Sequence, residues 1–313
     1  MNGLELSREY YEQYGRPLLE KDFSGLLPCI AVGLMGSGSE CLGFDDEVSR
    51  DHDFEPGFCI FLPGEETVNR RDAFLLEKAY LKLPKEFKGL RREMLAPVGG
   101  ARRGLIRIPD YFEKTVGSPD GRLTYKSWFS LPEQALLEAT SGEVFFDNFG
   151  LLTSIRKSLE FFPRDVMLKK LAGRLLLMGQ SGQYNYSRAL SHGETGAAQL
   201  AVYEFADSAM SAAFLLSEQY RPYYKWSFRA LRELTPFSFL AEPLEKLIST
   251  GNSRSEAEHK SSAMEDISCS IISSLKEKGL SGDEGSALEA HAYAVNAKIS
   301  DPEIRNANIL AAV

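Results

Sequence analysis

Cysteine, histidine and long apolar runs are all scarce in this chain of 313 residues. No apolar run reaches the roughly 18 residues of a membrane span, and the polar N-terminus, mixed in charge, predicts no secretory signal. The cysteines form no C-x-x-C pair and show no zinc-ligand spacing, so the sequence predicts reduced thiols in a cytoplasmic protein. They are Cys29, Cys41, Cys59 and Cys269. We therefore expect neither a disulfide scaffold, nor a zinc module, nor a membrane protein.

Positive charge is also in deficit. The 36 lysines and arginines face 44 aspartates and glutamates, for a net charge of −8. This balance disfavours a large nucleic-acid interface, because such an interface usually belongs to a basic domain. A small basic patch is compatible with it. The apolar fraction of 43% is ordinary for a folded protein, and the length is comfortable for two domains.

The first domain is predicted over residues 1–125, where strand patterns alternate with helix patterns. Such alternation indicates an α/β fold. The expected helices cover residues 4–20, a start at 39–42, the charged stretch 67–95 and a short segment 111–116. The expected strands cover residues 26–34, 53–62 and 103–108.

The second domain is predicted over residues 126–313 as an all-helical bundle. Helix-start signals recur along it, with capping residues or proline at the first turn. They stand at Ser130, Pro163, Ser253, Ser281 and Asp301.

The stretch Gly33-Leu-Met-Gly-Ser-Gly-Ser-Glu-Cys-Leu-Gly43, followed by Ser49-Arg-Asp-His-Asp-Phe54, carries the chemistry. Glycines let backbone N–H groups approach an anion closely. On a strand, Asp51 and Asp53 point to the same face, because side chains alternate with period two. Two neighbouring carboxylates suit Mg²⁺ that also holds a triphosphate.

The residue types in this stretch exclude other glycine-loop motifs. A Walker A loop needs a lysine after its last glycine, and none follows Gly36, Gly38 or Gly43. A dinucleotide fingerprint needs a third glycine where Cys41 stands. A kinase loop would need further lysine and Asp-Phe-Gly elements, which are missing.

At these residues the sequence resembles the nucleotidyltransferase superfamily, whose signature is Gly-Ser, a short spacer and Asp-x-Asp on the next strand. Gly38-Ser39 supplies the first element and Asp51-x-Asp53 the second, with 11 residues between them. Further phrases, spread over nearly the whole chain, resemble the DUF4037 proteins, a branch of that superfamily with no agreed reaction. They include Leu131-Pro-Glu-Gln134, Gly142-Glu-Val-Phe145, Phe162-Pro-Arg-Asp-Val166 and Tyr220-Arg-Pro-Tyr-Tyr-Lys-Trp226.

The resemblance implies an α/β (α+β) nucleotidyltransferase domain with a mixed sheet, followed by a helical bundle, as in kanamycin-type nucleotidyltransferases. It implies transfer of NMP from an NTP to a small-molecule or protein hydroxyl. Asp51 and Asp53 would hold one or two Mg²⁺ (or Mn²⁺) ions, and Gly38 and Ser39 would hold the departing phosphates.

The sequence departs from this pattern in two places. His52 stands between the aspartates, where an apolar residue is more usual, and is interpreted as a core or supporting histidine rather than a ligand. The strand at residues 103–108 has no third carboxylate; Asp110 lies just beyond it and is either that carboxylate or an ordinary helix-capping residue. A catalytically degenerate protein that binds nucleotide or another protein therefore stays open as an alternative.

Polar and aromatic residues in the helical domain have two interpretations. Tyr184, Arg188 and Lys225 either bind the nucleotide, through stacking and phosphate contacts, or form ordinary helix turns. Glu194 is either a substrate base or a solvated helix acid, and the second is favoured. The remaining histidines show no ligand spacing and are predicted to lie on the surface or at caps. They are His192, His259 and His291.

Overall fold

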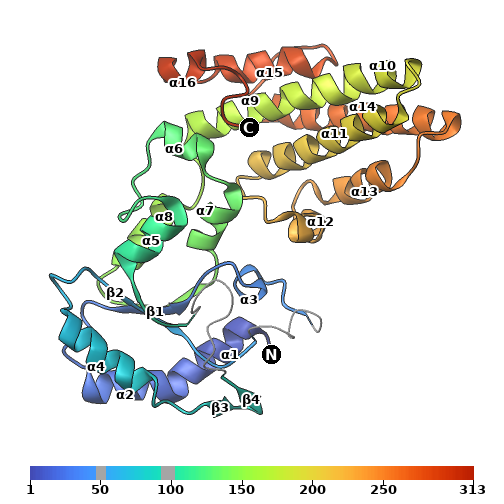
Figure 1. Ribbon diagram of the computed structural model, residues 1–313. Coiled ribbons are helices and arrows are strands. Elements are labelled where there is room, and N and C mark those ends of the chain that lie inside the picture. Colours follow the sequence, from blue (N-terminus) through green and yellow to red (C-terminus); the bar gives the residue numbers. More distant parts are fainter. Residues whose placement is uncertain (47–53, 93–102) are drawn as a thin grey trace. The chain divides into compact units, whose positions relative to one another are not determined.

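The chain folds into two compact units (Figure 1). The computed structural model describes residues 1–46, 54–92 and 103–313. The first unit contains residues 1–123 and 134–160, and the second contains residues 124–133 and 161–313. The predicted boundary at residue 125 lies close to the first crossing between the units. Residues 134–160, which the sequence assigned to the helical domain, fold instead with the first unit.

A four-stranded mixed sheet runs through the first unit in the order β5-β2-β1-β6. Its strands are β1 (Ala31–Leu34), β2 (Cys59–Leu62), β5 (Gly104–Arg107) and β6 (Glu143–Asp147). β1 pairs antiparallel with β2 and β6, while β2 pairs parallel with β5. β6 returns residues 134–160 to this unit, because the buried backbone of β1 needs hydrogen-bond partners on both sides. A small mixed sheet among many helices agrees with the α+β expectation.

The register brings several strand ends to one edge of the sheet. The pairs that define it are Gly33 with Cys59, Leu34 with Glu143, and Cys59 with Gly104. The C-terminal end of β1 therefore lies at the same edge as the starts of β2, β5 and β6. We call it the turn edge, because the glycine turn directly follows β1.

Helices surround the sheet and supply most of the first unit's core. Residues 3–22 form one continuous helical segment, as predicted. It consists of α1 (Gly3–Tyr10), a π-helical stretch (Tyr11–Gly15) and α2 (Arg16–Asp22). The other elements of this unit are α3 (Ser39–Leu42), α4 (Arg70–Tyr80), the hairpin β3 (Glu86–Phe87) and β4 (Leu90–Arg91), α5 (Ile108–Val116), α7 (Glu133–Thr140, which begins in the second unit) and α8 (Leu151–Ser158).

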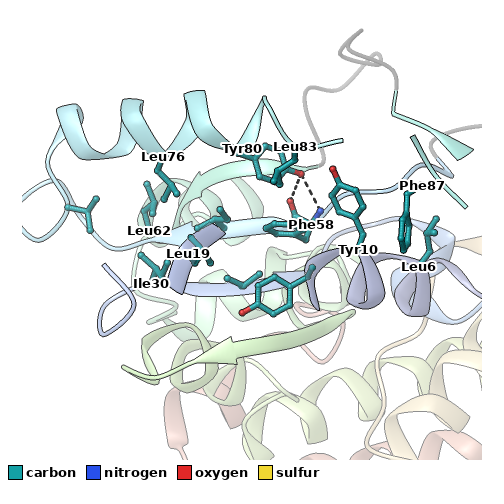
Figure 2. Packing of buried hydrophobic residues seen from close by; sticks show 14 residues of the cluster. Leu6, Tyr10, Leu19, Ile30, Phe58, Leu62, Leu76, Tyr80, Leu83 and Phe87 are labelled. Atoms are coloured by element: carbon teal, nitrogen blue, oxygen red, sulfur yellow. Dashed lines mark hydrogen bonds between the residues drawn. The ribbon is translucent and has the colours of Figure 1, made fainter. Parts of the chain in front are cut away.

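Phe58 is central to the core (Figure 2), where it stands just before β2. Its ring meets Tyr80 at a centroid distance of 5.1 Å and Tyr11 at 5.3 Å. The Tyr80 hydroxyl also donates to Phe58 O at 2.8 Å and accepts the Phe58 N–H at 3.2 Å. A side chain at Gly15 would collide with the Phe58 ring, so the helix can approach this closely only with glycine there. The core thereby fixes the entry to β2 at the turn edge.

The second unit is helical throughout the residues described. Its elements are α6 (Tyr125–Ser130), α9 (Arg164–Met178), a π-helical stretch (Gly179–Asn185), α10 (Tyr186–Ser191), α11 (Thr195–Leu216), α12 (Tyr224–Glu233), a 3₁₀ turn (Ser238–Leu240), α13 (Ala241–Ser249), α14 (Arg254–Glu277), α15 (Leu288–Ala297) and α16 (Pro302–Asn306). The long helix α9 packs against both α11 and α15 (Figure 1). Within the described ranges, no helix combines the length and the apolar character that a membrane crossing requires.

Several predicted elements end differently in the structure. β1 begins at Ala31 rather than at residue 26, and turns precede it. β2 begins at Cys59 rather than at residue 53. Pro56 lies in the non-strand residues before it, and proline has no backbone N–H to donate to a neighbouring strand. The helical pattern over 67–95 stops at Tyr80, because the hairpin β3–β4 follows. Within α4, Leu76 and Tyr80 are buried, whereas Leu75 is 45% exposed.

Candidate functional site

The glycine turn joins β1 to α3 at the turn edge, and α3 begins at Ser39 as predicted. Gly38 caps the N-terminus of α3 in an extended conformation, and Ser39 is half-buried. Gly36 has φ +127°, a backbone conformation that favours glycine, and a side chain there would meet no atom of a described residue within 4 Å. Space thus remains beside the turn for a group that contacts its backbone.

A buried carboxylate lies directly against this turn, and sequence analysis did not select it. Glu40 is 8% exposed, and a side chain at Gly38 would collide with its carboxyl group. Arg103, just before β5, lies 3.7 Å from Glu40 and 3.4 Å from Glu55 in ion pairs. The sequence does contain a signal for Glu40, because this residue directly follows Ser39 in the glycine-rich stretch.

A second carboxylate at the turn edge also faces an arginine. Glu143 opens β6 and accepts from Arg8 of α1, with Nε–Oε2 at 3.3 Å. Cys59 is the first residue of β2. Burial raises the pKa of its thiol to about 12, so the thiol stays protonated and unreactive. Among residues 1–46, 54–92 and 103–313, no group of three histidines, cysteines, aspartates or glutamates could hold a metal ion.

The predicted metal ligands Asp51 and Asp53, with His52 between them, lie outside the described residues. Their neighbour in the chain, Phe54, is described. A side chain at Gly3, the first residue of α1, would lie 3.5 Å from the Phe54 ring and would also collide with Glu40. The residue that follows Asp53 therefore lies close to the glycine turn.

Asp110 is not at the turn edge. It is an exposed residue in the first turn of α5, which follows the C-terminal end of β5. Because β5 runs parallel to β2, this end lies at the opposite edge of the sheet. The N-cap of α5 is Arg107, so Asp110 is a first-turn acid rather than the cap itself.

The nucleotide-binding residues predicted in the helical unit are exposed. The Arg188 guanidinium lies over the Tyr184 ring at 5.0 Å, and the Lys225 ammonium lies over the Trp226 ring at 5.2 Å. Tyr184 lies in the π-helical stretch with its side chain 57% exposed. Each pair combines a cation with an aromatic face.

Glu194 and the histidines have ordinary positions, with one exception. Glu194 is exposed at the N-cap of α11. His192 and His259 are exposed, as predicted. His291 is fully buried within α15, so the prediction that it lies on the surface or at a cap is wrong. Its Nδ1 lies 2.7 Å from Ser281 Oγ and its Nε2 lies 2.9 Å from the Gly285 carbonyl oxygen, both in the loop before α15.

An ionic network in the second unit is the main feature that sequence analysis missed. Asp207 of α11 accepts from Arg174 of α9 at 3.0 Å and from Arg221 at 2.6 Å. The Arg221 N–H donates to the Glu133 carboxylate at 2.8 Å. Burial raises the pKa of Glu133, while three nearby cations act to lower it. Two phrases that carried the resemblance, around Glu133 and around Arg221, thus meet in one network.

Aromatic residues also pack beside one another in the second unit. Tyr220 meets Phe162 at a ring-centroid distance of 5.0 Å, and Phe162 meets Trp128 at 5.8 Å. This packing ties the start of α9 to the loop before α12. The phrases that begin at Leu131, Phe162 and Tyr220 therefore lie close together in the second unit, whereas Gly142-Glu-Val-Phe145 belongs to the first unit.

Residues 128–227 match the family model described as Domain of unknown function (DUF4037). No curated protein matches the chain. The matched residues include the whole ionic network and follow the glycine turn in the sequence. The resemblance to DUF4037 proteins is thereby confirmed, and the chain contains a DUF4037 domain at residues 128–227.

Proposed function

We propose that this protein is a nucleotidyltransferase that moves NMP from an NTP to a hydroxyl of a small molecule or a protein. The observation that carries the proposal is the β1–glycine turn–α3 connection, followed in the chain by Asp51-x-Asp53 and then by β2 beside β1. The superfamily signature joins a glycine turn to paired carboxylates, and Asp51-x-Asp53 follows the turn and precedes β2 in the chain. In this proposal the first unit is the nucleotidyltransferase domain and the second is a helical bundle.

The residues of the turn would bind the triphosphate. Backbone N–H groups near Gly38 and the Ser39 hydroxyl would hold the departing phosphates, because charge develops there in the transition state. Asp51 and Asp53 would hold Mg²⁺ or Mn²⁺, which neutralises the triphosphate and polarises the α-phosphate when bound. Asp110 has no role in the proposed mechanism, because it lies at the other edge of the sheet.

The second unit offers exposed residues that suit contacts to a nucleotide. The exposed pairs Arg188–Tyr184 and Lys225–Trp226 offer a cation beside an aromatic face, which suits phosphate contact and ring stacking. The cysteine pattern, without zinc spacing, keeps a cytoplasmic location as part of the proposal.

The alternative is a nucleotidyltransferase-fold protein that binds nucleotide or a partner without turnover. One observation favours it: β5 carries no carboxylate, and an arginine, Arg103, directly precedes it at the turn edge. A guanidinium held between two carboxylates adds positive charge where active relatives place a metal ligand.

Transfer of label from NTPs distinguishes these functions. The full chain is incubated with labelled ATP, CTP, GTP or UTP, Mg²⁺ and a pool of metabolites and proteins. We expect transfer that falls by at least about a hundredfold in Asp53→Asn. The matched control is Asp22→Asn, an exposed aspartate at the end of α2, and it should retain full activity.

Binding is measured in parallel by thermal shift, since a ligand raises the melting temperature by mass action. A nucleotide-dependent shift without transfer, lost in Asp53→Asn, supports the binding protein. No shift and no transfer with any nucleotide contradicts both functions.

A further inference from the structure

Two arginines of the second unit share a single carboxylate. Arg174 Nη1 lies 3.0 Å from Asp207 Oδ2, and Arg221 Nη1 lies 2.6 Å from Asp207 Oδ1. We call Arg174 and Arg221 the arginine pair. Each guanidinium contacts a different oxygen, so the carboxylate bridges the two cations as a bound anion would.

The two arginines differ in how many of their donors are used. Arg221 Nη1 also donates to Asp207 O at 3.1 Å and to Ser211 Oγ at 2.9 Å, and its Nε donates to Ser227 Oγ at 3.3 Å. In the part of the chain that is described, Arg174 donates only through Nη1. Its side chain is 23% exposed, so its remaining N–H groups face solvent rather than a protein acceptor.

A third cation lies near the arginine pair. Burial raises the pKa of the Glu133 carboxyl, and Lys170, Arg174 and Arg221 all act to lower it. Lys170 and Arg221 are largely buried, and a partly desolvated cation favours an anionic partner.

We propose that the arginine pair, with the open edge of Arg174 as its entrance, binds a phosphate-type oxyanion. Guanidinium groups match phosphate oxygens with two parallel N–H donors, which an ammonium cannot do. Arg221 is held in place by its protein acceptors, so it needs little reordering when the anion arrives. Arg174 supplies the donors that the anion meets first.

Asp207 acts as an internal competitor in this site. Its side chain is 47% exposed and occupies donors that the anion would use. Removal of its charge should therefore strengthen anion binding even though it weakens the fold. If the network has only a structural role, removal of the Asp207 charge should lower the stability without strengthening anion binding.

Titration of the full chain with inorganic tripolyphosphate tests the proposal. The buffer contains EDTA and no divalent metal, and sodium chloride keeps the ionic strength constant, because exposed charges are screened by salt. We expect a saturable rise in melting temperature for the wild type. In Arg174→Gln the dissociation constant should rise at least about tenfold, which is 1.4 kcal/mol.

Two further variants make the test decisive. Asp207→Asn should melt at a lower temperature but bind tripolyphosphate at least about tenfold more tightly. This variant still tests the proposal if Arg174→Gln does not fold. Arg164→Gln is the matched control, because Arg164 is an exposed arginine on the same helix, and it should bind as the wild type does. The proposal is overturned if the wild type shows no saturable shift, if Arg174→Gln responds as the wild type does, or if Asp207→Asn does not bind more tightly.

The source of the oxyanion is decided by comparing probes. Inorganic phosphate, a sugar phosphate, tripolyphosphate and metal-free ATP are titrated in turn. Tighter binding of tripolyphosphate and ATP indicates a nucleotide triphosphate, and equal binding of phosphate and sugar phosphate indicates a phosphorylated acceptor. Because no metal is present and Asp51 and Asp53 are not involved, failure of this site and failure of the proposed transfer reaction are separate results.

Discussion

Tyr80→Phe removes one hydroxyl from the core of the first unit and should loosen the entry to β2. Phe58 O keeps a second donor, the Gly104 N–H at 3.0 Å, so the variant leaves only the Phe58 N–H without its partner. An unsatisfied buried donor costs about 1–3 kcal/mol, and the lost bond to the carbonyl costs about 0.5–1.5 kcal/mol. We therefore expect a loss of about 2–4 kcal/mol in the free energy of unfolding.

The same hydroxyl makes this stability depend on pH. Burial raises the pKa of Tyr80 from 10.0 to about 12. A raised pKa in the folded state means that the contribution is complete below pH 10.0 and is lost as the pH rises through about 12. The shift corresponds to about 2.7 kcal/mol, so the difference between wild type and Tyr80→Phe should shrink by about that amount in strong base.

Urea denaturation of both proteins, at about pH 8 and at about pH 11, measures this difference, and about half of the loss, about 1.4 kcal/mol, is expected by pH 11. Hydrogen exchange of residues 54–62 then reports on the first unit alone, because two units need not unfold together. Tyr203→Phe is the control, since Tyr203 is 50% exposed and its hydroxyl makes no hydrogen bond to any described residue. A cost below about 0.5 kcal/mol, or a cost that does not change with pH, would refute the reasoning.

Two other perturbations test the remaining structure. Gly142→Ala should destabilise the first unit by more than about 2 kcal/mol, because Gly142 has φ +76° and a side chain would overlap the Leu34 carbonyl. Gly117→Ala, at φ +71° with no atom within 4 Å, should cost only about 1 kcal/mol, and equal losses would contradict the steric argument. Burial raises the pKa of Glu133, so its contribution is largest at low pH and falls as the pH rises through its raised value. Glu133→Gln should remove that slope from urea midpoints measured between about pH 4 and pH 7, and an unchanged slope would contradict it.

Local patterns predicted much of the first unit. The helix over residues 3–22, the start of α3 at Ser39 and the strand β5 follow from apolar spacing and capping, which act within a few residues. Strand ends were predicted less well. β1 and β2 are shorter than expected, because pairing with neighbouring strands decides where a strand begins, and the apolar run does not.

The candidate site was predicted only in part, for a similar reason. The glycine turn was recognised because its residue types are specific, while Glu40 and Arg103 were missed because their pairing joins residues far apart in the chain. The paired aspartates Asp51 and Asp53 lie outside the described residues, and their role as metal ligands stays a prediction.

The sequence by itself determined the glycine turn, the helical character of the C-terminal part and the resemblance to DUF4037 proteins. These depend on residue types and short spacings, which a linear chain states directly. Only the tertiary structure decided that residues 134–160 return to the sheet, that Asp110 lies at the edge opposite the glycine turn, and that Glu133, Asp207 and Arg221 meet in one network. Such pairings depend on which distant segments share backbone hydrogen bonds and buried charge, and packing in three dimensions determines them.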